Sequence, residues 1–335
     1  MNRETNPILI VDHLSKSFGR TRMWEKNPVN AVSDVSFTLE RQSILAIVGE
    51  SGSGKSTIAR LIAGLLMPTL GQITVAGNVM PRRMTFRQKL KHRKDIQMIF
   101  QDPFSALNPH YSVRYHLERS LRNFGGSSPK ERRERVCEAL ESVGLSPTSD
   151  YLEKKPHELS GGQRQRVVIA QALIVQPKVV LADEPTSMLD VSMRLGILNL
   201  MKKLRDELGL SYVFITHDLA SARYISDHIL VMYAGKIVEY GRTVDVIEHP
   251  AHPYTKVLLS AVPDPKKIRS GGQQRVMLKG EPPNLAHLPQ GCYFHPRCPF
   301  VMPVCKEETP RVHQNDQGHW ALCHLAESQE VSEHV

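Results

Sequence analysis

The sequence predicts an α/β protein whose sheet carries a nucleotide site, followed by a loop-rich C-terminal region. Three observations indicate this organisation. A short apolar run, Ile44 to Val48, leads directly into the glycine-rich segment GESGSGKS at residues 49–56, and apolar residues at helical spacing follow it. Further apolar runs of similar length end in polar residues, as strands of a buried parallel sheet do. Four of the five cysteines fall after residue 290, beside clustered prolines and glycines.

The composition indicates a folded chain with more than one domain. Its 335 residues exceed the roughly 100–200 residues of an ordinary domain, and 41% of them are apolar. No uncharged apolar run approaches the ~20 residues of a membrane-spanning helix, and MNRETNPILIVDHL shows no signal-peptide pattern. We therefore expect a soluble, cytoplasmic protein, in which disulfides are disfavoured. The net charge of +9 fits a nucleic-acid binder, a protein beside an anionic membrane, or a basic protein with neither partner.

The segment at residues 49–57 is expected to bind the phosphates of a nucleotide. Strand, glycine-rich loop and helix stand in the order that a phosphate-binding loop requires. The glycines let backbone N–H groups turn toward the phosphates, and the helix N-terminus adds partial positive charge. Lys55 should reach the β- and γ-phosphates, and the Ser56 hydroxyl should ligate Mg²⁺. The expected nucleotide contacts are Gly49, Glu50, Ser51, Gly52, Ser53, Gly54, Lys55, Ser56 and Thr57.

Three more apolar runs end in residues that suit the other side of such a site. KVVLA precedes Asp183, and an acidic residue at that end of a strand faces the ligand crevice of a nucleotide-binding sheet. Asp183 is expected to hold Mg²⁺, and Glu184 to polarise the attacking water as a general base. SYVFIT precedes His217, and IQMIF precedes Gln101. Spacing alone assigns no role to His217 or Gln101.

The segment LSGGQRQR at residues 159–166 is a second candidate anion site. A serine and two glycines stand just before a helix expected from Gln163 to Ile174, whose N-terminus can bind a phosphate. A nucleotide held by the first loop does not need a second anion site from the same chain. The segment has a use if it closes over a nucleotide that another chain holds.

Taken in order, these motifs resemble the ATP-binding subunit of ABC transporters. The chain shows GESGSGKST, a glutamine after an apolar run, LSGGQ, VVLADE, the loop SMLD and ITHD. The resemblance implies an ABC-type P-loop nucleotide-binding domain with a helical subdomain, and it implies ATP and Mg²⁺ as ligands. A loop-rich C-terminal accessory domain completes the expected fold.

The resemblance also implies residue roles. Gln101 contacts Mg²⁺ and senses the membrane partner, Glu184 is the catalytic base, and His217 is the switch histidine near the γ-phosphate. Asp190, in the loop SMLD, links the two sites of a dimer. Phe18 stacks on adenine, with Trp24 as the nearby alternative. The signature that caps the partner's ATP consists of Ser160, Gly161, Gly162 and Gln163.

The C-terminal region narrows the resemblance to the oligopeptide/dipeptide importers. AHPYTKVLLSAVPDP and GEPPNLAHLPQGCYFHPRCP carry it, together with NPHYSV after Gln101. It implies an ATPase that powers import of peptides or a related solute at the cytoplasmic face of the plasma membrane. The implied partners are two permease subunits, a paralogous or identical ATPase subunit and, indirectly, an external solute-binding protein, with no nucleic acid. The alternative is a soluble ABC ATPase acting on nucleic acid or ribosomes, which the basic charge suits but the single LSGGQ does not.

The chain is expected to divide near residue 245. Residues 1–245 would form the ATPase domain, with its core in 1–95 and 178–245 and its helical subdomain in 96–177. Residues 246–335 would form the oligopeptide/dipeptide-type extension. The cargo is not readable from the sequence, since relatives of this branch import peptides, glutathione, nickel complexes or oligosaccharides.

The four C-terminal cysteines are candidate metal ligands. Four thiolates can bind zinc or hold an iron–sulfur cluster, and their spacing lacks the CxxC pairs of most zinc sites. The resemblance to the importer branch implies a [4Fe–4S] cluster. Zinc, with His295, His319 or His324 as substitute ligands, and unmetallated thiols stay open as alternatives. The four cysteines are Cys292, Cys298, Cys305 and Cys323.

Overall fold

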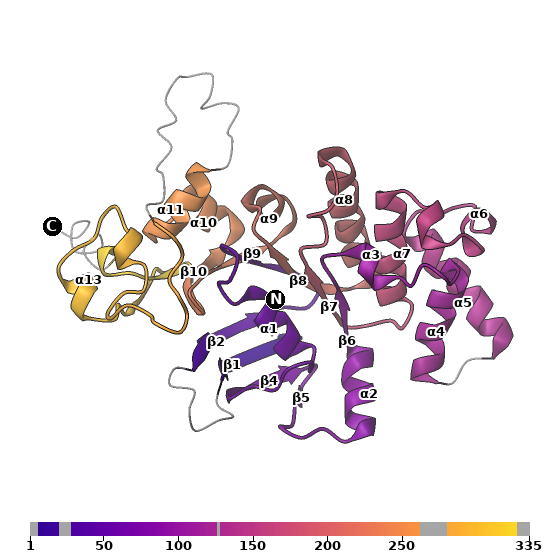
Figure 1. Ribbon diagram of the computed structural model, residues 1–335, viewed down its shortest axis with the longest axis horizontal. Helices are drawn as coiled ribbons and strands as arrows, with labels where there is room; N and C mark the ends of the chain where they lie inside the picture. The colour runs from indigo at the N-terminus through magenta and orange to yellow at the C-terminus, as the bar shows by residue number, and fades with distance from the viewer. Residues whose placement is uncertain (1–5, 20–27, 126–127, 262–279, 327–335) are drawn as a thin grey trace.

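A computed structural model of the chain describes residues 6–19, 28–125, 128–261 and 280–326. Its centre is an eight-stranded sheet with the strand order β11-β12-β10-β9-β3-β8-β7-β6 (Figure 1). The strands from β9 to β6 are parallel, as their uninterrupted apolar runs predict, whereas β10, β12 and β11 join antiparallel. The strands are β3 (Ile44–Val48), β6 (Ile96–Ile99), β7 (Val179–Asp183), β8 (Ser211–Thr216), β9 (His228–Tyr233), β10 (Lys236–Arg242), β11 (Val312–Gln314) and β12 (Trp320–Leu322).

A second, four-stranded antiparallel sheet lies on one side of the central sheet, with helix α1 (Lys55–Ile62) between the two. Ile58, Leu61 and Ile62 of α1 are fully buried among side chains from both sheets. The helix that follows the phosphate loop is thus anchored on two faces. The second sheet has the order β2-β1-β4-β5 and consists of β1 (Leu9–Phe18), β2 (Val29–Leu39), β4 (Leu70–Val75) and β5 (Asn78–Val79).

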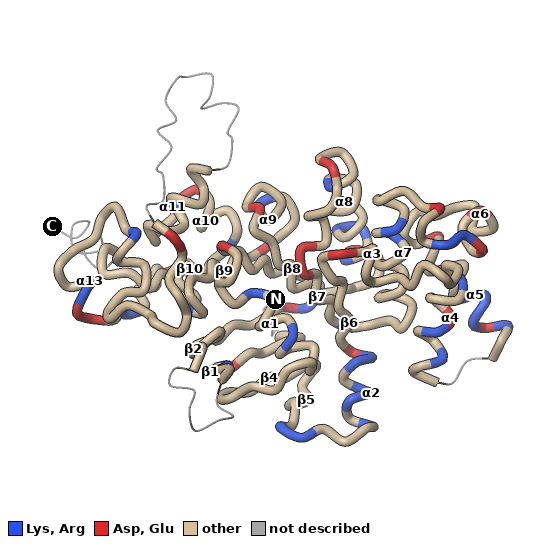
Figure 2. The backbone as a smooth tube through the Cα atoms, viewed as in Figure 1, with Lys and Arg blue, Asp and Glu red and all other residues tan. Residues whose placement is uncertain are grey.

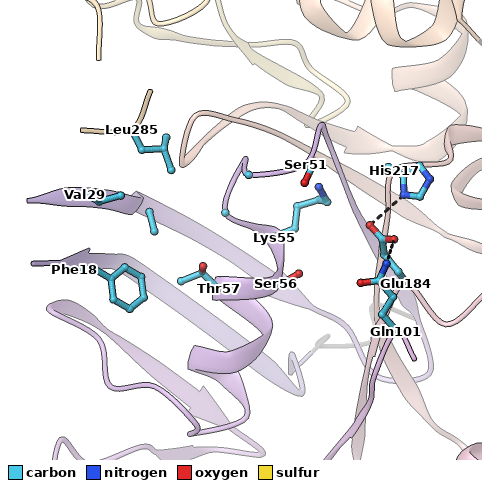
Figure 3. A pocket seen from close by; sticks show the side chains of 13 residues that line it. Phe18, Val29, Ser51, Lys55, Ser56, Thr57, Gln101, Glu184, His217 and Leu285 are labelled. Atoms are coloured by element: carbon cyan, nitrogen blue, oxygen red, sulfur yellow. Dashed lines mark hydrogen bonds and ion pairs between the residues drawn. The ribbon is translucent and has the colours of Figure 1, made fainter. Parts of the chain in front are cut away.

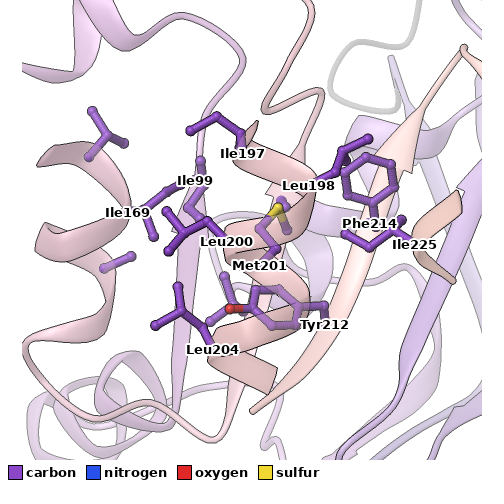
Figure 4. Close-up of a cluster of buried hydrophobic side chains, with 14 of the residues drawn as sticks. Ile99, Ile169, Ile197, Leu198, Leu200, Met201, Leu204, Tyr212, Phe214 and Ile225 are labelled. Carbon is purple, nitrogen blue, oxygen red and sulfur yellow. The ribbon is translucent and has the colours of Figure 1, made fainter. Parts of the chain in front are cut away.

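Helices cover the opposite face of the central sheet. Figure 4 shows Leu200, Met201 and Leu204 of one of these helices beside Tyr212 and Phe214 of β8, and all five side chains are buried. The sheet is therefore apolar on both faces, which explains why its strands read as continuous apolar runs. The helices on this face are α7 (Gly161–Leu173), α8 (Val191–Leu208) and α9 (Leu219–Ile225).

The stretch between β6 and β7 is helical, as expected. Val136 and Leu140 are buried on one face of α5, at the helical spacing that the sequence shows. β6, at the start of the predicted helical subdomain 96–177, pairs with β7 of the central sheet, and the division into subdomains stays a prediction. The elements of this stretch, with α2 before it, are α2 (Phe86–Asp95), α3 (Pro103–Ala106), α4 (Val113–Phe124), α5 (Pro129–Ser142), α6 (Ser149–Leu152) and η1 (Pro156–Glu158).

The C-terminal extension is attached to the central sheet rather than separate from it. Its short hairpin of β11 and β12 pairs with β10 through Tyr240 opposite Trp320 and Glu239 opposite Ala321. Where the structure describes it, in residues 280–326, the remainder is largely loop, as the prolines and glycines predict. From residue 243 onward the described helical elements are α10 (Thr243–Glu248), α11 (Pro253–Ser260), η2 (His295–Arg297) and α13 (Val304–Glu307).

The basic charge is not spread evenly. Figure 2 shows Lys and Arg gathered on α2 and along α4 and α5. α2 has no buried residue, so its basic side chains face solvent. Among the described residues, none of the helices combines the length and the apolar character that crossing a bilayer requires.

Candidate nucleotide site

The carboxyl ends of four parallel strands bring the predicted site residues to one edge of the central sheet. β3 leads into the loop 49–54, β7 ends at Asp183 beside Glu184, β8 precedes His217, and β6 precedes Gln101. A cavity of about 750 Å³ lies at this edge (Figure 3), and cavities of this size suit small-molecule ligands. It is lined by Phe18, Val29, Ala31, Ser51, Gly52, Gly54, Lys55, Ser56, Thr57, Gln101, Glu184, His217 and Leu285.

Two glycines allow the phosphate loop to run close to neighbouring backbone. Gly49 has a φ of +152°, and a Cβ there would come within 2.3 Å of the Met232 carbonyl oxygen. Gly54 has a φ of +105°, and a Cβ there would come within 2.4 Å of the Ala31 carbonyl oxygen. Any side chain at either position would clash with main-chain atoms, so the loop path requires glycine.

Lys55 is the first residue of α1, and its side chain points into the loop. Lys55 is only 5% exposed, and its Nζ donates hydrogen bonds to the carbonyl oxygens of Gly49 at 2.8 Å and Glu50 at 2.7 Å. Burial lowers the pKa of Lys55, and the carboxylates of Glu184 and Asp183 oppose that shift. The ammonium is thus held by carbonyl oxygens at the start of the loop, from where it can pair with phosphate oxygens.

Ser56 and Asp183 lie in contact across the site. The Ser56 hydroxyl donates a hydrogen bond to Asp183 Oδ1 at 3.1 Å. Burial raises the pKa of Asp183, and the hydrogen bond from Ser56 opposes that shift. Hydroxyl and carboxylate oxygens are the donors that Mg²⁺ prefers, so this pair fits the ion that the resemblance implies.

Glu184 occupies the side of the cavity that faces the loop. Its Oε1 is 3.1 Å from His217 Nδ1, and its Oε2 accepts a hydrogen bond from Gln101 Nε2 at 3.1 Å (Figure 3). Its backbone has a φ of +48°, a conformation that residues other than glycine seldom adopt. Side chains from two other strand ends therefore fix the direction of this carboxylate.

Apolar side chains line the other end of the cavity. Figure 3 places Phe18, Val29 and Leu285 together, away from Glu184 and His217. Phe18 is where the sequence predicts contact with a base, and its ring is partly exposed at 38%. The alternative aromatic residue, Trp24, lies outside the described residues.

Some predicted contacts adjoin the cavity without lining it, and some contacts were not predicted. Leu285 reaches the cavity from the C-terminal extension, and Arg297 of the same extension forms an ion pair with Glu50 of the phosphate loop. No periodicity or motif in the sequence pairs these residues with the loop. The predicted contacts that the cavity lining omits are Gly49, Glu50, Ser53, Asp183 and the signature residues.

The signature segment lies apart from this cavity. Ser160 begins α7, accepting a hydrogen bond from the Gln163 N–H at 3.2 Å, while Gln163 Oε1 accepts one from the Ser160 N–H at 3.0 Å. With this reciprocal capping the helix begins at Gly161, two residues earlier than expected. Asp190 similarly caps α8, accepting a hydrogen bond from the Met193 N–H at 2.8 Å. The helix N-terminus at Ser160 is thus available to a ligand that this chain's own loop does not hold.

The four C-terminal cysteines line one small cavity, together with His295 and His324. All four are free thiols, and burial raises the pKa of Cys292 to about 11. Burial also raises the pKa of Cys298 and of Cys323. Burial therefore favours the protonated form of these three thiols unless a cation binds them.

The donors fit a metal in kind and number but not in their present spacing. Four thiols suit zinc or an iron–sulfur cluster. Across the part of the chain that the structure describes, however, no three His, Cys, Asp or Glu residues stand close enough together to hold a metal ion. The cavity between the cysteines is narrow, with room for the centre of a water-sized sphere in only about 10 Å³.

Two protein-family profiles match the chain. Residues 32–187 match the family described as ABC transporter, and residues 238–305 match the oligopeptide/dipeptide transporter C-terminal region. The first match contains the phosphate loop, the signature and Glu184. The second begins in β10 and ends at Cys305.

Curated relatives match almost the whole chain. The oligopeptide transport ATP-binding protein AppF of Bacillus subtilis is 44% identical over 97% of this chain and 98% of its own length. The dipeptide transport ATP-binding protein DppF of Haemophilus influenzae is 43% identical over 96% of this chain and 97% of its own length. The similarity thus includes both the nucleotide site and the extension.

Solved structures share the fold. The cbiO1 protein of Clostridium perfringens, part of an ABC transporter complex, has a TM-score of 0.64 and 29% identity, covering 72% of this chain and 91% of its own. The ATP-binding cassette MJ0796, solved as a dimer bound to ADP and Pi, has a TM-score of 0.61 and 30% identity, covering 70% of this chain and 98% of its own. The chain therefore belongs to the ATP-hydrolysing ABC transporter ATP-binding proteins, in the branch that carries the oligopeptide/dipeptide transporter C-terminal region.

Proposed function

We propose that this chain hydrolyses ATP in the cavity between its phosphate loop and Glu184 to power uptake of peptides, or of a related small solute, through a membrane permease. The observation that carries the proposal is Glu184, held by Gln101 and His217 opposite the loop of Lys55. The cargo class rests on the relatives, which are named for oligopeptide and dipeptide transport. These relatives lend no support to the alternative of an ATPase acting on nucleic acid or ribosomes.

Each group of residues has a separate task in the proposed reaction. Lys55 and the loop N–H groups would bind the β- and γ-phosphates, and Ser56, Asp183 and Gln101 would hold Mg²⁺, which when bound would supply positive charge to the phosphate oxygens. Glu184 accepts a proton from the attacking water, and His217 keeps the carboxylate directed at the γ-phosphate. Phe18, beside Val29 and Leu285, contacts the adenine.

A dimer completes the site. Ser160, Gly161, Gly162 and Gln163 would cap the ATP held by a second ATPase subunit, because in their own chain they do not line the cavity. The solved relative MJ0796 is a dimer, which supports such pairing. The second subunit is a paralogue or a copy of this chain, and the loop at Asp190 would join the two sites.

The wider assembly follows from the same branch. Two permease subunits would dock on the helical region between β6 and β7, and Gln101 would report their state to the site. An external solute-binding protein would deliver the cargo to the permeases. This arrangement places the chain at the cytoplasmic face of the plasma membrane.

We also propose a [4Fe–4S] cluster on the four C-terminal cysteines, with zinc as the alternative. The support is that Cys292, Cys298, Cys305 and Cys323 line one cavity although they are spread over 32 positions of the chain. A metal there would tie together a loop-rich segment that has little apolar core of its own. The role is structural or sensing.

Replacing the base tests the reaction. Glu184→Gln keeps the shape and the hydrogen bond from Gln101 but removes the proton acceptor, so hydrolysis should fall at least ~10²-fold while ATP still binds. Hydrolysis is measured in the complex with its permeases, and ATP affinity in the isolated chain. Glu207→Gln, a substitution in an exposed ion pair of α8, is the matched control and should act like the wild type. A native hydrolysis rate in Glu184→Gln would show that the base is another group.

Metal analysis tests the cluster. Protein purified without oxygen should contain about four irons and four acid-labile sulfides per chain, and Cys298→Ser should lose them. Cys137→Ser, which changes a half-buried thiol on α5, is the control and should retain them. One zinc per chain would support the zinc site and contradict the cluster. Protein without any metal would refute both.

A further inference from the structure

The C-terminal extension touches the phosphate loop itself. Arg297 Nη1 lies 2.6 Å from Glu50 Oε2, and Arg297 Nη2 lies 3.0 Å from Glu50 Oε1. The guanidinium therefore donates two hydrogen bonds to the carboxylate. The Arg297 side chain is 6% exposed and the Glu50 side chain 24%. This ion pair spans 247 positions of the sequence. Because the pair is largely shielded from solvent, its charge-assisted hydrogen bonds are strong.

Every polar group of Glu50 has a partner, and two of the partners, Tyr254 and Arg297, belong to the extension. The Glu50 N–H donates a hydrogen bond to the Tyr254 hydroxyl at 2.9 Å, and Tyr254 is fully buried in α11. The Glu50 carbonyl oxygen accepts a hydrogen bond from Lys55 Nζ at 2.7 Å. Glu50 follows Gly49 directly, so these contacts fix the beginning of the loop.

Arg297 is in turn held in place. Its Nη1 lies 3.4 Å from the Tyr233 hydroxyl, and its guanidinium carbon lies 5.9 Å from the centre of the Tyr233 ring. The rings of Tyr254 and Phe294 pack against Tyr233 at centroid distances of 4.8 and 5.2 Å. These contacts hold the guanidinium in one orientation, so Arg297 can fix the position of the Glu50 carboxylate.

The charge of Glu50 needs this partner. The loop must receive the negative charges of a polyphosphate, and the Glu50 carboxylate is near enough to act on the charge of Lys55. An unpaired carboxylate there would repel the incoming phosphates, whereas the contact with Arg297 neutralises it. Leu285 adds a second point at which the extension reaches the site, since it lines the cavity beside Phe18.

We propose that Arg297 is a positioning residue of the nucleotide site, which neutralises Glu50 and fixes the phosphate loop, so that the C-terminal extension forms part of the ATP site. This proposal rests on the proposed function, because it takes ATP to be the ligand of the loop. It assigns the extension a direct role in nucleotide binding, independent of whether its cysteines carry a metal.

The test compares the affinities of the full-length chain for ATP, ADP and AMP, measured by competition against a fluorescent ATP analogue. In Arg297→Gln the affinity for ATP should fall about tenfold or more, that for ADP less, and that for AMP least, because the repulsion grows with the phosphate charge. Adding Glu50→Gln should recover most of the loss, since the unpaired charge is then gone. Arg297→Lys keeps the charge but not the two-point geometry, so it should lie between the wild type and Arg297→Gln.

A matched control comes from a similar ion pair elsewhere. Arg242 grips Asp245 at 2.7 and 3.0 Å and does not line the cavity, so Arg242→Gln should leave all three affinities unchanged. Unchanged ATP affinity in Arg297→Gln, equal losses for the three nucleotides, or no recovery with Glu50→Gln would each overturn the positioning role. If Arg297→Gln does not fold, Arg297→Lys decides, and wild-type ATP affinity in that variant would overturn it. A wild-type chain that binds no nucleotide would instead refute the proposed function, and the positioning role with it.

Discussion

Side chains at the nucleotide site contact partners that lie at the ends of other strands. Ser56 contacts Asp183, and Glu184 contacts both His217 and Gln101. The sequence places each of these residues at the end of an apolar run, because the strands are buried on both faces. It does not pair them, since the pairing depends on the order of the strands in the sheet. The structure brings these residues to one edge of the sheet, and their assignment to a nucleotide site, like the role of each, stays a prediction.

His252 illustrates what burial does to one side chain. It is 1% exposed at the start of α11, and its Nδ1 accepts a hydrogen bond from the Tyr254 N–H at 3.0 Å. Burial lowers the pKa of His252 to about 4. The imidazole is therefore neutral in the folded protein at pH values where the unfolded chain, with a pKa near ~6.5, already binds a proton.

This shift predicts a loss of stability in acid. As the pH falls from about 6.5 toward 4, the unfolded chain takes up a proton that folded His252 does not, so the free energy of unfolding decreases. Between pH 7.5 and 5.0 the decrease from this residue should be about 2 kcal/mol. His252→Asn keeps a hydrogen-bond acceptor for Tyr254 and should lose less stability over that range.

Denaturant unfolding of both proteins at the two pH values checks this. Other histidines with a lowered pKa, His92, His116 and His228, contribute equally to both proteins and cancel in the comparison. Parallel losses of stability in wild type and His252→Asn would contradict the assignment.

At the scale of elements, the local pattern of residues predicts strands of the central sheet. It does not predict how the C-terminal extension attaches to that sheet. The predicted strands before Asp183, His217 and Gln101 are confirmed as β7, β8 and β6, because apolar runs mark them. The strands β11 and β12 were not predicted. They have three residues each, too few to show an alternating pattern, and they form by pairing with β10.

A buried carboxylate explains how that attachment is held. Glu239 of β10 is fully buried and accepts hydrogen bonds from the N–H groups of Ala251 at 2.7 Å and His252 at 3.0 Å. Its Oε1 lies 2.8 Å from His319 Nε2, just before β12. One side chain thus joins a core strand, the start of α11 and the C-terminal hairpin. In the sequence, Glu239 reads as an ordinary polar residue of a peripheral strand, and no motif marks it.

At the scale of the whole molecule, the nucleotide site includes residues from outside the ATPase domain and omits one segment within it. It gains residues from the extension, through Leu285 at the cavity and Arg297 at Glu50. It lacks the signature segment at Ser160, which does not line the cavity of its own chain. The sequence does not predict the first feature, because it depends on contacts between distant parts of the chain. It does indicate the second, because a second anion site is redundant for a nucleotide that the chain's own loop holds.

The split site predicts that binding and turnover can be separated. Ser160→Arg places a bulky cation where the second subunit's ATP should be capped. ATP affinity of the isolated chain should stay unchanged, since Ser160 does not line its cavity. ATP hydrolysis by the complex with its partner ATPase and permeases should fall at least about tenfold, because the capped site cannot close.

Ser128→Arg is the matched control for that experiment. Ser128 begins α5 as Ser160 begins α7, accepting a hydrogen bond from the Glu131 N–H at 3.2 Å, the same distance as that between Ser160 and the Gln163 N–H. Both substitutions remove one exposed helix cap, at a cost of about 1 kcal/mol of stability. Only Ser160→Arg should lower ATP hydrolysis by at least about tenfold, because only α7 is expected to face a nucleotide. Equal hydrolysis in the two variants would mean that the segment at Ser160 caps its own helix and nothing else.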